Sequence, residues 1–145
     1  MVMQCVSKLL TFSALFPELV LVNIMVIYDI KARKSKGKFV IGRIQKINDI
    51  MRLLTKDNTL NEEGYDVILY LDKAVFTHIG KKDRVRIIRH LLRHIYIDTD
   101  SVTDPYKIQE PEIKDFHVEQ HLNKDDVDWV GRLTAIAKSI HGLNE

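Results

Sequence analysis

Two histidines four residues apart, His90 and His94, are the residues of this chain best placed to do chemistry. Within a helix, side chains at this spacing lie on one face about one turn apart, so both imidazoles can bind a single metal ion. Zinc peptidases place a glutamate directly after the first histidine, because that carboxylate accepts the proton of the metal-bound water. This chain has Leu91 there. The pattern therefore predicts a metal-binding geometry without the general base that hydrolysis requires.

Residues 83–97 form the best-defined helix that the sequence predicts. Apolar residues recur at helical spacing along one side, which indicates a face packed against a core. His90 and His94 lie at the edge of that face, and a continuous basic stripe follows the far side. The apolar stripe consists of Val85, Ile88, Leu92 and Ile95, flanked by Ile87 and Leu91; the basic stripe consists of Lys82, Arg86, Arg89 and Arg93.

The other predicted elements place this helix in an α+β domain. Residues 21–30 are rich in β-branched side chains, and a basic loop with Gly37 as its turn residue connects them to residues 39–44, so the two segments are expected to pair as a hairpin. Residues 66–71 alternate in polarity and indicate a third strand. We expect a sheet of three or four strands packed against the histidine helix and C-terminal helices, in one domain over residues 1–145. The remaining helices are predicted over residues 3–16, 48–54, 110–122 and 126–140, and Asn48 is the expected N-cap of the second of these.

Charge is distributed unevenly along the chain, although the net charge is only +2. Residues 31–46 contain seven Lys or Arg and no acid, and residues 81–94 contain six against one Asp. Residues 98–128 reverse this, with ten acids against three lysines. Two interpretations remain open: the poles face each other within the fold, or the basic surface binds an anionic partner.

Composition narrows the class of protein further. A single cysteine, Cys5, excludes an internal disulfide and a Cys-rich zinc module, and fits a reducing compartment, so we expect a cytoplasmic protein. The apolar stretch 20–30 has about half the length of a transmembrane helix, so no membrane association is expected.

The order of these features resembles the phage metallopeptidase domain, a small zincin-like family. Members begin with a β-hairpin whose basic linker is similar to residues 28–37, and a strand similar to residues 66–71 precedes the metal helix. A later helix begins with a His-acid-Ile-x-x-Phe pattern, to which residues 112–116 are similar, and a segment containing a tryptophan, as at Trp129, ends the domain. The resemblance covers roughly residues 15–140, and the metal motif is its specific part.

The resemblance implies a zinc site in which two of four functional residues are altered. His90 and His94 match the first two ligands, whereas Leu91 replaces the catalytic glutamate. Pro111 stands where the third histidine is expected, and it has no metal-binding side chain. Glu110 or Glu112, which flank this position, could supply an oxygen ligand, which zinc accepts.

Two hypotheses of different classes follow. The favoured one is a zincin-like domain of phage or prophage type, descended from a metallopeptidase and catalytically degenerate, with a peptide or protein as partner. The alternative is a non-enzymatic module that contacts nucleic acid or an acidic protein through the loop 31–38 and the basic stripe of the central helix. His117 and His121 also lie four apart, and a solvated helix edge is the simpler interpretation of that pair.

Overall fold

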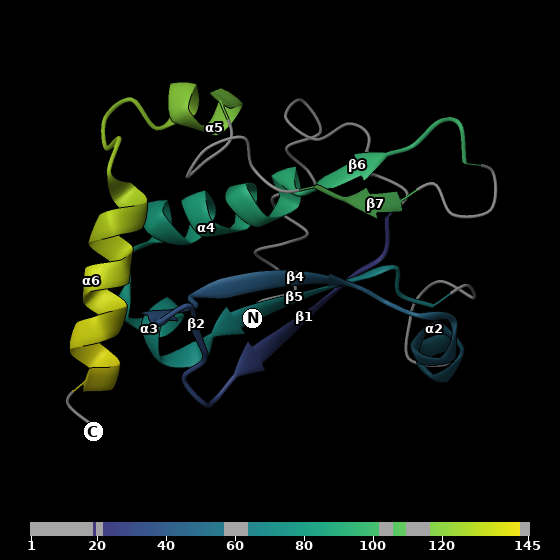
Figure 1. Ribbon diagram of the computed structural model, residues 1–145, viewed down its shortest axis with the longest axis horizontal. Coiled ribbons are helices and arrows are strands. Elements are labelled where there is room, and N and C mark those ends of the chain that lie inside the picture. The colour runs from purple at the N-terminus through teal and green to yellow at the C-terminus, as the bar shows by residue number, and fades with distance from the viewer. Residues whose placement is uncertain (1–18, 20–21, 57–63, 102–105, 110–116, 143–145) are drawn as a thin grey trace.

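A computed structural model describes residues 19, 22–56, 64–101, 106–109 and 117–142. Figure 1 shows a sheet with one long helix lying across it and a further helix along one end of both. The described residues form an α+β fold, as the sequence predicts. The helix expected over residues 3–16 and the first part of that expected over 110–122 lie outside the described residues.

The main sheet has three strands in the order β1 (Ile24–Asp29), β5 (Val67–Asp72) and β4 (Gly42–Lys46). β5 pairs with β1 in parallel and with β4 antiparallel. All three strands were predicted, but the hairpin expected between the first two was wrong, because β5 separates them. β5 is buried along almost its whole length, and such an apolar strand is most stable in the centre of a sheet, where both edges are paired.

A smaller hairpin occupies the connection from β1 to β4. It consists of β2 (Lys34–Ser35) and β3 (Lys38–Phe39), which pair antiparallel. The two residues between them, Lys36 and Gly37, have φ values of 50° and 76°. Both lie in the left-handed region that a tight two-residue hairpin turn requires, and glycine adopts it without steric cost. The predicted turn at Gly37 is therefore confirmed.

Short polar side chains fix the starts of two helices. Asn48 accepts a hydrogen bond from the amide of Met51 and caps α2 (Asp49–Thr55), as predicted. Asp72, the last residue of β5, accepts one from the amide of Val75 and begins α3 (Lys73–His78), which was not predicted. Two further helices follow the central one: α5 (His117–Leu122) and α6 (Trp129–Gly142). None of the described helices is long and apolar enough to cross a bilayer.

The central helix, α4 (Lys81–Arg93), ends four residues earlier than predicted. Residues Ile95–Ile97 instead form β6, which pairs antiparallel with β7 (Tyr106–Ile108). The reason is tertiary: β-branched and aromatic side chains favour a strand once a partner strand is present. The chain returns along β7, so Gln109 lies beside the C-terminal end of α4, where its amide donates a 2.6 Å hydrogen bond to the carbonyl of His94.

The core lies where α4, α6 and β5 meet. Ile88 and Leu92 of α4 are fully buried, as is Leu133 of α6. They form one apolar cluster with the side chains of β5, among them Leu69 and Leu71. Each such side chain contributes about 1.5–3 kcal/mol when removed from water. The predicted apolar stripe of α4 is thus confirmed as the face that fixes this helix on the sheet.

The opposite face of α4 is also largely buried, against acidic residues of the C-terminal part. Arg86 is only 4% exposed and forms ion pairs with Asp83, Asp125 and Asp126. The hydrogen bond from Lys82 lowers the pKa of Asp125 to about 2, with Arg86 acting in the same direction. The basic residues of α4 and the acidic residues between α5 and α6 therefore face each other within the fold.

Glu119 of α5 extends this ion-pair network. Its side chain is fully buried and lies 3.1 Å from the guanidinium Nε atoms of both Arg89 and Arg93. Arg89 also donates a hydrogen bond to the buried Asn123. A carboxylate and two guanidinium groups that are shielded from solvent are stable only when they neutralise each other. This contact holds α5 against α4.

Replacing Glu119 by Gln should lower the free energy of unfolding by about 3–5 kcal/mol, because two largely buried guanidinium groups lose their counter-charge. Urea denaturation followed by circular dichroism measures the loss. Asp100→Asn, a neutralisation at an exposed position, is the matched control and should change stability by less than about 0.5 kcal/mol. Equal effects of the two substitutions would contradict the role given to Glu119.

Candidate functional site

The two histidines of the predicted metal motif lie at the C-terminal end of α4. His90 is in its last turn, and His94 is the residue that caps it. Their ring centroids are 5.2 Å apart and the rings are nearly perpendicular. The His90 ring also makes an edge contact with Trp129, the first residue of α6, at 5.8 Å between centroids. The structure thus brings the pair together where two helices meet.

His94 is oriented by a backbone contact. Its Nδ1 lies 2.6 Å from the carbonyl oxygen of Gln109. Because a carbonyl can only accept, Nδ1 carries the hydrogen in this bond, and in the neutral imidazole Nε2 then holds the lone pair. Metal-binding histidines are commonly oriented in this way, by donating the other ring N–H to a carbonyl or carboxylate.

The donors around these histidines are too few for a catalytic zinc. Such a zinc usually has three protein ligands and an open position. Within the described ranges, no three His, Cys, Asp or Glu side chains lie close enough together to hold a metal ion. The expected third ligand, Glu110, lies outside the described residues, as does Pro111. The two described imidazoles therefore do not make a complete metal site.

Leu91, at the position of the general base, is a core residue. It is 4% exposed and belongs to the apolar cluster of α4, β5 and α6. A Cβ atom added at Gly42, the first residue of β4, would lie 2.9 Å from a methyl group of Leu91. The strand and the helix approach closely here because residue 42 has no side chain. The described part of the site therefore offers an apolar contact where a peptidase holds a carboxylate.

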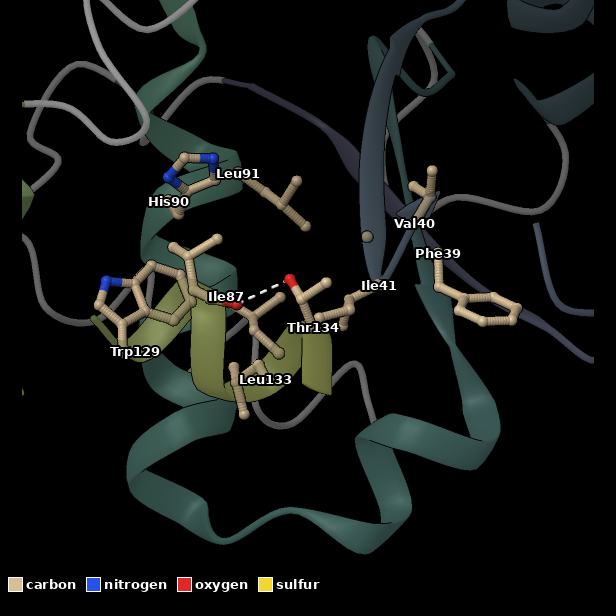
Figure 2. Close-up of a pocket in the computed structure, with 11 residues that line it drawn as sticks. Phe39, Val40, Ile41, Ile87, His90, Leu91, Trp129, Leu133 and Thr134 are labelled. Atoms are coloured by element: carbon tan, nitrogen blue, oxygen red, sulfur yellow. Dashed lines mark hydrogen bonds between the residues drawn. The ribbon is translucent and has the colours of Figure 1, made fainter. Parts of the chain in front are cut away.

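A cavity of about 210 Å³ lies beside Leu91, between α4 and α6 on one side and the chain entering β4 on the other. Figure 2 shows Ile87, His90 and Leu91 on α4, with Trp129 and Leu133 on α6, around this space. Thr134 also lines it, but its hydroxyl donates to the carbonyl of Val130, 2.7 Å away, so it contributes little polarity. His90 is the one polar ring on an otherwise apolar wall. Residues 39–42 form the opposite wall.

Sequence reasoning missed most of this cavity. Trp129 and Leu133 fall in the helix predicted over residues 126–140, and Gly42 falls in the strand predicted over residues 39–44, but helical or strand spacing does not show which surface such residues share. The one local signal was a glycine at the start of a strand, which often marks a close approach of another segment.

The basic stripe predicted as a binding surface has a different setting from the one expected of an exposed face. Arg86, Arg89 and Arg93 lie in the ion-pair network described above, whereas Lys82 is exposed and pairs with Asp125. Nucleic-acid binding by this stripe stays a prediction. Of the second histidine pair, His121 is exposed, and the side chain of His117 is outside the described set.

Comparison with known proteins decides the family. Residues 8–138 match the family described as "Putative phage metallopeptidase". The chain belongs to this family. No curated protein and no solved structure matches it significantly. The match spans both histidines, Leu91, Pro111 and Trp129, so the altered motif lies inside a chain that follows the phage metallopeptidase pattern almost from end to end.

The position that the zinc motif assigns to glutamate is occupied by Leu91 in this chain. Whether Leu91 is part of the core can be tested by substitution. Leu91→Ala should lower the free energy of unfolding by about 2–3 kcal/mol, because it enlarges the adjoining cavity. Leu91→Met keeps the volume and should cost less than about 1.5 kcal/mol. Chemical denaturation of the two variants measures the difference. If Leu91→Ala were as stable as the unchanged protein, Leu91 would not be part of the core.

Proposed function

We propose that this protein is a zincin-like domain of phage or prophage type that descends from a metallopeptidase and has lost hydrolytic activity. The observation that carries the proposal is the burial of Leu91 against Gly42 at the position of the general base. An aliphatic side chain can neither accept nor donate a proton, and general acid–base catalysis typically contributes 10²–10⁴-fold to the rate. The side chain that replaces the general base is therefore part of the packing of α4 on β4.

A residual metal site, with zinc as the family's expected ion, would use His90, His94 and Glu110. The Nδ1 bond of His94 to Gln109 supports this assignment, because it leaves Nε2 with the lone pair that a metal needs. Glu110 is the next residue in the sequence after Gln109, whose carbonyl oxygen contacts His94. Zinc bound there would act as a Lewis acid, but these residues supply no proton acceptor in place of Leu91.

The cavity beside Leu91 supports binding of an extended peptide. Its walls are apolar apart from His90, and β4 lies at one edge of the three-stranded sheet. Extended peptides bind along sheet edges and place alternate side chains in neighbouring pockets. We infer that an apolar side chain of a peptide occupies the cavity, which would make the domain a peptide-binding module.

The alternative function is binding of nucleic acid or an acidic protein through the loop 31–38 and the basic stripe of α4, and the part that concerns the stripe has less support. A phosphate could engage Arg86, Arg89 or Arg93 only by displacing carboxylates that already neutralise them. Displacing Glu119, which is fully buried, would also open the contact between α4 and α5. The arginines of the stripe therefore stabilise the contact between α4 and the acidic residues that follow it.

Metal binding is tested on protein purified without a histidine tag in zinc-replete medium. We expect about one zinc per chain, measured by mass spectrometry of the metal, and loss of that zinc in His90→Ala and in His94→Ala. His78→Ala, at an exposed histidine of α3, is the matched control and should retain the metal. Absence of metal from the unchanged protein would remove the residual site from the proposal.

Ancestry is tested by restoring the two altered positions. Leu91→Glu combined with Pro111→His supplies a general base and a third imidazole, so the double variant should cleave an unstructured protein substrate in a reaction that chelators stop. The unchanged protein should show no such cleavage under the same conditions. The single variant Pro111→His is the control, since it adds a ligand but no proton acceptor. Chelator-sensitive cleavage by the unchanged protein would overturn the proposed loss of activity.

A further inference from the structure

The connection from β1 to β4 holds the most concentrated charge in the chain. Residues 30–48 contain seven Lys or Arg and no acid. The remaining positions contain 15 basic and 20 acidic residues (22 − 7 and 20 − 0), a net charge of −5. The segment therefore carries the whole positive excess of a chain whose net charge is +2. An excess gathered in one short segment produces a strong local field.

This charge lies on an exposed surface. Every residue from 30 to 38 is exposed, and the segment folds back as the β2–β3 hairpin. In Figure 1, β2 lies at the end of the sheet next to α3 and α6, opposite the end that leads into α2. Arg33 pairs with Asp29 at 2.8 Å, but Lys31, Lys36 and Lys38 contact no acidic side chain in the described part of the chain. The arginines of α4, in contrast, are neutralised by carboxylates.

Two arginines and a lysine also surround a hollow at the base of the hairpin. The hollow has a volume of about 330 Å³ and is lined by Arg33, Lys34, Ser35, Val40 and Arg43. The Arg43 guanidinium lies over the ring of Tyr70, 3.8 Å from its centroid, which holds it in a fixed plane. A planar guanidinium matches two oxygens of a phosphate, and the Ser35 hydroxyl adds a neutral donor.

We propose that the β2–β3 hairpin and this hollow bind the phosphate backbone of a nucleic acid. The field of the hairpin attracts the polyanion, the exposed lysines contact successive phosphates, and the Arg43 guanidinium binds one phosphate in the hollow. An anionic membrane fits less well. Ile30, at 84% exposure, is the one large apolar side chain strongly exposed in the described segment 30–43, and stable membrane anchoring needs a broader apolar contact.

This inference goes beyond the proposed function and is independent of it. The hairpin surface lies outside His90, His94 and Leu91, and the cavity beside Leu91 shares only Val40 with the hollow. Nucleic-acid binding can therefore be present or absent whatever the metal and peptidase tests show.

The test measures binding of the full chain to a fluorescent 30-base-pair DNA duplex by anisotropy at several salt concentrations. We expect binding at low salt and a linear fall of the logarithm of the association constant with the logarithm of salt concentration. Lys31→Glu combined with Lys38→Glu should weaken binding at least tenfold and reduce the slope by about 2, since each lost phosphate contact removes about 0.9. Arg43→Gln should weaken binding further in that background.

The matched control is Lys56→Glu combined with Lys124→Glu, which makes the same change in net charge at two exposed positions away from the hairpin. It should bind the duplex nearly as well as the unchanged protein. An equal loss in both double variants would show a net-charge effect only and would overturn the proposal. So would absence of DNA binding at low salt, or binding to vesicles containing phosphatidylserine but not to the duplex. Circular dichroism of each variant verifies that the fold is kept.

Discussion

Arg86 lies on α4 with 4% exposure, and a guanidinium so far from water is stable only beside carboxylates. That constraint organises the C-terminal part of the described chain. Asp125 and Asp126, which lie in the turn between α5 and α6, form ion pairs with Arg86. One and two turns further along α4, Arg89 and Arg93 pair with Glu119 of α5. Burial of apolar side chains fixes one side of α4 on the sheet, and neutralisation of its arginines fixes the other. The two histidines, Trp129 and the cavity between α4 and α6 are held in place by both contacts.

The altered motif is consistent with this packing. A metallopeptidase needs a carboxylate after its first histidine, facing a wet cleft, whereas Leu91 faces Gly42 and belongs to the apolar cluster. The space beside it is an apolar cavity with one imidazole on its wall. The bond between His94 and Gln109 keeps an orientation that suits metal binding. The apolar packing of Leu91 is therefore the basis of the proposed loss of hydrolytic activity.

Two basic surfaces of the same chain have opposite settings. The arginines of α4 form intramolecular ion pairs, whereas Lys31, Lys36 and Lys38 are exposed to solvent and contact no acidic side chain in the described part of the chain. The sequence does not distinguish the two surfaces, because both are runs of Lys and Arg with few acids nearby. The difference arises because the acidic residues Glu119, Asp125 and Asp126, which lie 26–33 positions after the end of α4 (119 − 93 and 126 − 93), fold back onto that helix and leave the hairpin uncovered.

The sequence by itself determined what depends on neighbours along the chain. The apolar stripe of α4, the turn at Gly37, the cap at Asn48 and the strand character of β5 all follow from spacing and local backbone preference, and the histidine motif was visible at once. Only the tertiary structure decided that β5 lies between β1 and β4, that α4 stops at Arg93, and that residues 95–97 form a strand. It also decided that the arginines of the basic stripe pair with acidic side chains and that Gly42, Trp129 and Leu133 share a cavity with Leu91. These outcomes depend on contacts between residues far apart in the chain, whose energies no local pattern contains.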